Sequence, residues 1–327
     1  MLIAMLALYV VLDMTHDTVM PGVLLFLNVA LLVVYALAPI LGEFVGSCLA
    51  TRCDWFVCWC ARWGYIRIIK YMASLNVNVR IRNDWALCDA AANGHVNVVQ
   101  YLVSIGADVK ANGHYPLRAS AVGGYLETVQ FVTSQYDVHG TEHENALVMA
   151  AMKGHLKVVK YLVQKGANIH AEEECALRCS AKNGHVKVVK YLITLGAKIH
   201  ADDDYALRAS ALKGNYEMVR LLCLNDANIH TNNNEALRLS AENGHLKIVK
   251  YLVKSGAKLT SCDHKTMREA AYAGHTKVVK YLMEAGVAFH EDVLYNAAAA
   301  NHYELVDFLR MHRAQTTKKT NSASTNE

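Results

Sequence analysis

The sequence predicts an all-α fold, a solenoid of about nine stacked helix pairs. The main observation is a glycine that recurs every 30 residues, since a fixed period of roughly 20 to 50 residues is typical of repeat architectures. Around each glycine lie two segments with helical spacing of apolar residues. A ninth, degenerate unit has Asn301 in the glycine position. The glycines of the regular units are Gly64, Gly94, Gly124, Gly154, Gly184, Gly214, Gly244 and Gly274.

The sequence of each unit predicts two helices, called helix A and helix B below. Before the glycine, residues 205–211 carry small side chains around Leu207, as a helix packed tightly between neighbours requires. After the glycine, helix B has one apolar stripe, for example Val158, Val159, Leu162 and Val163. The turn glycine suits a positive φ, and Gly166 suits the end of helix B. Neither helix buries its apolar residues alone, so units must stack, and Leu177 should fill the space between them.

The repeated run Ala-Leu-Arg-x-Ser-Ala-x-x-Gly-His-x-x-Val-Val-x-Tyr-Leu-x-x-x-Gly-Ala resembles the ankyrin consensus over residues 51–312. Two features depart from that family. The unit has 30 residues where the family has ~33, and Thr-Pro-Leu-His has become x-Ala-Leu-Arg, with its proline kept only at Pro116. Because the missing residues lie between repeats, we expect short fingers. In style the unit resembles the mimivirus-like ankyrin families of giant amoebal DNA viruses.

Polar residues recur in three positions of the unit. Residues just before helix A are expected to cap its amides, at Asp84, Glu174, Asp204 and Asn234. An arginine replaces the histidine of the ankyrin motif in helix A and is expected to bridge repeats, at Arg118, Arg178, Arg208, Arg238 and Arg268. Lysine pairs should form a solvated outer face of helix B, at Lys157/Lys160, Lys187/Lys190, Lys247/Lys250 and Lys277/Lys280.

The sixteen histidines do not form a predicted metal or catalytic site. Most occur once per unit, after the turn glycine or in the connector, and repeats stacked ~10 Å apart cannot share a metal with ligands at ~2 Å. We therefore expect them to bond backbone groups. The chain has no phosphate loop and no Gly-x-Ser-x-Gly, His-Glu-x-x-His or kinase motif. The sequence thus predicts no enzyme activity, no cofactor, no metal and no small-molecule substrate.

The two ends of the chain differ from the repeats. Residues 1–50 are hydrophobic, and 25 uncharged residues, 18–42, are long enough to cross a bilayer as a helix. The alternative is a pair of helices packed on the open end of the solenoid. Residues 313–327 are polar and predict a disordered tail. The net charge of +4 comes from lysines spread over many repeats, which argues against a nucleic-acid partner.

Four cysteines lie where the predicted membrane helix meets the first repeat: Cys48, Cys53, Cys58 and Cys60. Their spacing lacks the Cys-x2-Cys pair that lets two thiolates reach one zinc ion. One interpretation is S-acylation beside the membrane. The favoured interpretation is that they are small apolar residues of a degenerate capping repeat.

These features together predict a single-pass membrane-tethered scaffold whose repeats bind a cytosolic protein, a host factor if the protein is viral. The alternatives are a soluble adaptor for host ubiquitin machinery and a regulatory subunit of a membrane enzyme or channel. Partner binding is placed on the fingers, where three triplets vary between fixed flanks and two of them are acidic. The triplets are Glu172, Glu173 and Glu174, then Asp202, Asp203 and Asp204, then Asn232, Asn233 and Asn234.

Overall fold

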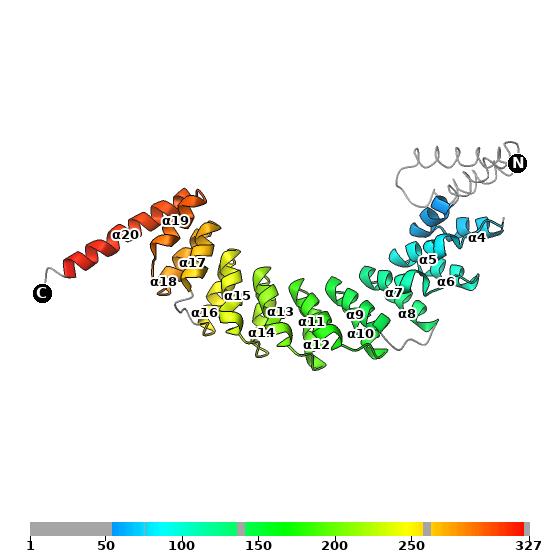
Figure 1. Ribbon diagram of the computed structural model, residues 1–327. Helices are drawn as coiled ribbons and strands as arrows, with labels where there is room; N and C mark the ends of the chain where they lie inside the picture. The colour runs from blue at the N-terminus through cyan, green and yellow to red at the C-terminus, as the bar shows by residue number, and fades with distance from the viewer. Residues whose placement is uncertain (1–53, 75, 136–140, 258–262, 324–327) are drawn as a thin grey trace, which may run out of the picture. The chain divides into compact units, whose positions relative to one another are not determined.

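The computed structural model describes residues 54–74, 76–135, 141–257 and 263–323, and all regular structure within these ranges is helical (Figure 1). The chain divides into two compact units, Met1–Glu142 and His143–Glu327. The predicted hydrophobic segment 1–50, with its span 18–42, lies outside the described residues. None of the described helices combines the length and apolar character needed to cross a bilayer.

The described part of the chain contains nine helix pairs, as the glycine period predicts. In the first unit, a helix at residues 54–62 pairs with α4 (Ile66–Ser74), α5 (Ile81–Ala92) with α6 (Val96–Ser104), and α7 (Ala111–Gly123) with α8 (Leu126–Ser134). Helix α9 (Thr141–Lys153) begins at the boundary between the units and pairs with α10 (Leu156–Gln164).

The second unit continues the same order of A and B helices. Its pairs are α11 (Ala171–Lys182) with α12 (Val186–Thr194), α13 (Ala201–Leu212) with α14 (Tyr216–Cys223), α15 (Thr231–Glu242) with α16 (Leu246–Lys254), α17 (Asp263–Tyr272) with α18 (Thr276–Glu284), and α19 (Glu291–Ala299) with α20 (Tyr303–Ala323). The A helix α13 packs between α11 and α15, while the B helix α14 packs between α12 and α16. Each layer of the solenoid is therefore built from helices of one kind.

The core is a column of leucines contributed once per repeat by the A helices. Leu177 is 1% exposed, which confirms its predicted place between repeats. In helix B, Val158, Val159 and Leu162 are buried, but Val163 is only half-buried, so the apolar stripe is narrower than predicted. The leucines that share this position are Leu87 and Leu117 in the first unit, and Leu147, Leu177, Leu207 and Leu237 in the second.

The turn glycine of each repeat serves two purposes. Gly154 has a φ of +81°, which residues with a Cβ rarely adopt. A Cβ there would also lie 2.4 Å from Nδ1 of His185, the histidine that follows the next turn glycine. The Nε2 of His185 lies 2.9 Å from the carbonyl oxygen of Met152 and donates to it. This confirms the predicted backbone role for the histidine after the turn glycine and shows that the bond joins one repeat to the next. The connector histidines differ from the prediction, because His170 and His200 contact the side chains of Glu174 and Asp204.

The carboxyl end differs from the sequence prediction. Residues 313–323, predicted to be part of a disordered tail, continue helix α20 to Ala323. No glycine or proline, the strongest helix-ending residues, occurs after Tyr303. Polar composition by itself therefore did not determine the local structure of this segment.

Replacing Leu177 by Ala should lower the free energy of unfolding by about 2 to 5 kcal/mol, because it leaves a cavity between repeats. Leu195, in the same repeat, is 41% exposed, and Leu195→Ala should cost less than about 1 kcal/mol. Urea denaturation followed by circular dichroism measures both. Equal losses in the two variants would show that the leucine column is not the main source of stability.

Candidate protein-interaction surface

The three triplets lie in a backbone conformation that the sequence analysis did not anticipate. In α13, Asp202, Asp203 and Asp204 have φ of 53°, 50° and 53° and form one left-handed turn ahead of helix A proper. The same turn begins α11 and α15, and α5 and α7 in the first unit. Asp, Asn and Gly tolerate this conformation better than other residues. Their enrichment here was therefore the sequence signal for the turn.

The left-handed turn divides each predicted triplet between solvent and core. The third residue turns inward: Glu174 is 2% exposed, Asp204 is 4% exposed, and Asn234 is half-buried. The inference that these third residues contact a partner is therefore corrected. The first two residues of each triplet remain exposed: Glu172, Glu173, Asp202, Asp203, Asn232 and Asn233.

The buried third residue joins its turn to the following repeat. The Asp204 carboxylate accepts a hydrogen bond from the backbone N–H of Asn228 at 2.9 Å and another from the Thr231 hydroxyl at 2.8 Å. In the first unit, Asp84 likewise accepts from the N–H of Asp108 at 2.9 Å. The prediction that these residues cap their own helix is wrong, because an N-cap residue has an extended rather than a left-handed backbone.

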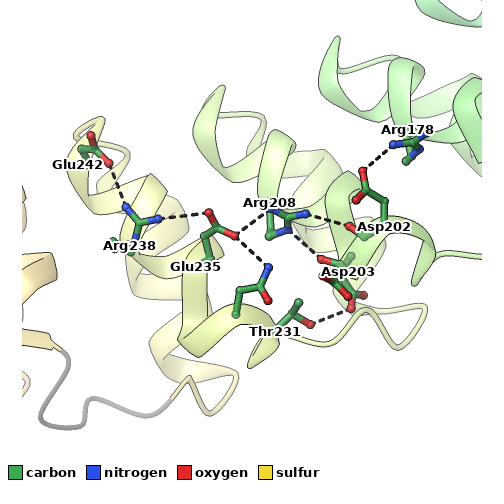
Figure 2. Close-up of polar contacts among 10 residues, drawn as sticks. Arg178, Asp202, Asp203, Arg208, Thr231, Glu235, Arg238 and Glu242 are labelled. Atoms are coloured by element: carbon green, nitrogen blue, oxygen red, sulfur yellow. Dashed lines mark hydrogen bonds and ion pairs between the residues drawn. The ribbon is translucent and has the colours of Figure 1, made fainter.

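Four arginines of the column bridge repeats, as predicted, and two of these, Arg178 and Arg208, also stabilise the turns (Figure 2). The fifth, Arg118, donates to the Asn112 carbonyl of its own turn. Arg208 donates to the carbonyl oxygens of Asp203 and Asp202 at 2.8 and 2.9 Å, and its Nη1 lies 2.9 Å from Oε2 of Glu235 in the next repeat. Arg178 donates to the Glu172 carbonyl at 3.0 Å. One guanidinium thus satisfies turn carbonyls and forms an ion pair with the following repeat.

These ion pairs decide which acidic charges remain available on the finger edge. The Asp202 carboxylate lies 2.6 Å from Nη1 of Arg178, so its charge is largely offset within the scaffold (Figure 2). Glu172, Glu173 and Asp203 are exposed and belong to two successive turns. We call these three residues the acidic edge.

The lysine pairs are exposed on helix B, in agreement with the prediction, except that Lys280 is half-buried. The sequence analysis missed a second role for the later lysine of a pair. Its Nζ lies over an aromatic ring of the next repeat, at 5.4 Å for Lys160 over Tyr191 and 5.3 Å for Lys250 over Tyr281. These distances permit a cation–π interaction. The recurring Lys-Tyr dipeptide was the signal that could have revealed it.

Two cysteines of the predicted amino-terminal cluster, Cys58 and Cys60, belong to the first described helix pair. Cys60 is completely buried, which agrees with the interpretation as a small apolar packing residue and leaves no access for acylation in this structure. Burial raises the pKa of the half-buried Cys58 thiol to about 11, so it carries little thiolate at neutral pH. Cys48 and Cys53 lie outside the described residues, and S-acylation there stays a prediction. Within the described ranges, no three His, Cys, Asp or Glu residues are grouped to hold a metal.

Comparison with known proteins agrees with this repeat geometry. A family model described as ankyrin repeats (3 copies) matches the chain three times, at residues 57–141, 117–203 and 200–263. Together these matches cover more than half of the sequence. The chain belongs to the ankyrin-repeat family. No curated protein matches the chain as a whole or in part. Membership in the ankyrin-repeat family indicates a protein-binding scaffold in general terms.

Replacing Asp204 by Ala in this ankyrin-repeat protein should cost about 2 to 3 kcal/mol, because Asn228 and Thr231 lose a charged hydrogen-bond acceptor. Asp203→Ala is the matched control, since both changes put alanine at a positive φ and Asp203 is exposed. It should cost at most about 1 kcal/mol. The prediction fails if thermal denaturation shows the two variants to be equally stable.

Proposed function

We propose that this ankyrin-repeat chain is a scaffold whose acidic edge, Glu172, Glu173 and Asp203, binds a basic segment of a partner protein. The supporting observation is that the first two residues of each triplet are exposed, whereas the third turns inward. The third residue and the arginine hold the backbone of the turn, while the first two side chains face solvent. Recognition residues can therefore change without altering the contacts that join the repeats.

The physics of the acidic edge predicts how binding depends on conditions. Exposed carboxylates attract a basic partner mainly by raising its association rate, and this attraction weakens as salt shortens the Debye length. The turns are already held by hydrogen bonds, so binding should order few additional side chains. We therefore expect fast, salt-sensitive association without a large change in helix content.

The test compares the full chain with a variant carrying Glu172→Gln, Glu173→Gln and Asp203→Asn. A matched control removes three exposed acids from the B-helix side of the same unit, with Glu217→Gln, Asp226→Asn and Glu284→Gln. Proteins captured by each form at low salt are identified by mass spectrometry. The proposal expects a basic partner that the parent and the control retain and the edge variant loses. Identical capture by all three forms would contradict it.

We further propose that residues 18–42 tether the chain to a membrane, with the repeats on the cytosolic side. The support is the 25-residue uncharged run and the distribution of charge: residues 1–51 contain no Lys or Arg, whereas Arg52, Arg62, Arg67 and Lys70 follow. If the resemblance to viral ankyrin families reflects its origin, the membrane and the partner belong to the host. The soluble adaptor and the regulatory subunit remain the alternatives.

Carbonate extraction of membranes from expressing cells tests the tether, and the chain should stay in the pellet. A glycosylation acceptor added at the carboxyl tail should remain unmodified if the repeats face the cytosol. Release into the supernatant would favour the soluble adaptor, while a modified acceptor would reverse the orientation. Co-purification with an enzymatic activity would favour the regulatory subunit.

A further inference from the structure

All four tryptophans of the protein lie in the first unit, at Trp55, Trp59, Trp63 and Trp85. Three of them line a cavity of about 150 Å³ between the helix at 54–62 and α5. The other lining residues are Cys58, Arg62, Arg82 and Asp89. We call this cavity the tryptophan socket. It lies within the first unit, whereas the acidic edge lies in the second.

The walls of the tryptophan socket are held in place by other rings. The Trp59 ring lies 5.9 Å from Phe56 and 5.4 Å from Tyr65, measured between ring centroids. The Trp85 ring stacks on Tyr115 at 5.8 Å. Rings braced in this way lose little freedom when a ligand binds between them, which favours affinity.

The tryptophan socket is accessible to solvent. Trp55 is 56% exposed and Trp85 is 40% exposed. Large aromatic side chains are normally buried on average, and tryptophan is enriched among the residues that carry the binding energy of protein interfaces. An exposed pair that flanks a cavity therefore indicates a docking position for a side chain of another protein.

The charged residues on the rim of the tryptophan socket indicate which kinds of ligand can bind there. Arg62 lies 3.0 Å from Asp89, and Arg82 lies 3.6 Å from Asp54. Both arginine side chains are more than half exposed, which leaves N–H donors accessible to a ligand. Aromatic cages commonly hold cations, but each carboxylate on this rim is already paired with an arginine, so neither is left to bind a cationic guest. The exposed arginine N–H groups suit carbonyl or carboxylate oxygens instead.

The size of the cavity points to one ring-sized side chain. Its volume is below the range of roughly 300 to 1,000 Å³ that is usual for small-molecule sites. Proline-rich segments bind aromatic-lined grooves as preformed polyproline II helices, whose backbone carbonyls stay free to accept hydrogen bonds. We propose that the tryptophan socket binds a proline-rich segment in this conformation, flanked by acidic residues that meet Arg62 and Arg82.

The intrinsic fluorescence of the full chain provides a direct test, because every tryptophan is in or near the tryptophan socket. The probe is a synthetic oligoproline peptide with glutamates at both ends. Its addition should shift the emission saturably, and Trp55→Ala or Trp85→Ala should weaken binding roughly tenfold or more. Trp63→Ala is the matched control, since Trp63 is 60% exposed but does not line the cavity, and it should leave the affinity unchanged.

Further peptides and variants separate the possible outcomes. An alanine peptide with the same ends should not bind, and a lysine-flanked oligoproline should bind more weakly than the glutamate-flanked one. If thermal denaturation shows that a tryptophan variant is unfolded, Arg82→Gln replaces it, since Arg82 is 62% exposed, and it should weaken only the glutamate-flanked peptide. Absence of saturation, equal binding of the alanine peptide, or unchanged affinity in folded variants would overturn the proposal. The acidic-edge variant should bind the peptide like the parent, so the two proposals fail separately.

Discussion

The repeats of this protein depend on hydrogen bonds that only a neighbouring repeat can complete. The Asp204 carboxylate needs the N–H of Asn228, and the Met152 carbonyl needs the ring of His185. These groups are largely withdrawn from water, and an isolated repeat would leave them without a partner at substantial cost. The same dependence explains the glycine at the turn, because the histidine of the next repeat occupies the space that a Cβ would need.

This dependence also shapes the surface that is available for binding. The left-handed turn has to present its third side chain to the next repeat, and its carbonyls require the arginine that follows in helix A. The side chains of Glu172, Glu173 and Asp203 take no part in these contacts and are exposed. The contacts that hold the turn and the side chains that remain exposed thus belong to the same short segment. Glu172 and Asn232 occupy equivalent positions with different charge, which is possible because neither determines the turn.

The position immediately after the left-handed turn carries different chemistry in the two units. The residue immediately after the turn is Trp85 in the first unit, and it is Tyr205 and Glu235 in the second. In the first unit this position builds an aromatic cavity, while in the second unit Glu235 pairs with Arg208 and Arg238. One backbone plan can therefore carry either an aromatic residue or an ion-paired glutamate at this position, because stacking fixes the backbone and leaves the position variable.

The sequence by itself determined the helix pairs, the buried place of Leu177, the backbone role of the histidines after the turn glycines and the bridging arginines. Each of these follows from the period of 30 residues, which can be read from the sequence without knowing the contacts between repeats. Tertiary structure alone decided that Asp204 turns inward and Asp203 outward, since the partners of Asp204 lie 24 and 27 residues further along the chain. The tryptophan socket was missed for the same reason, although Trp55 and Trp85 are one period apart. Two adjacent aspartates therefore differ, one exposed and one buried, because the next repeat and not the local sequence supplies the contacts of Asp204.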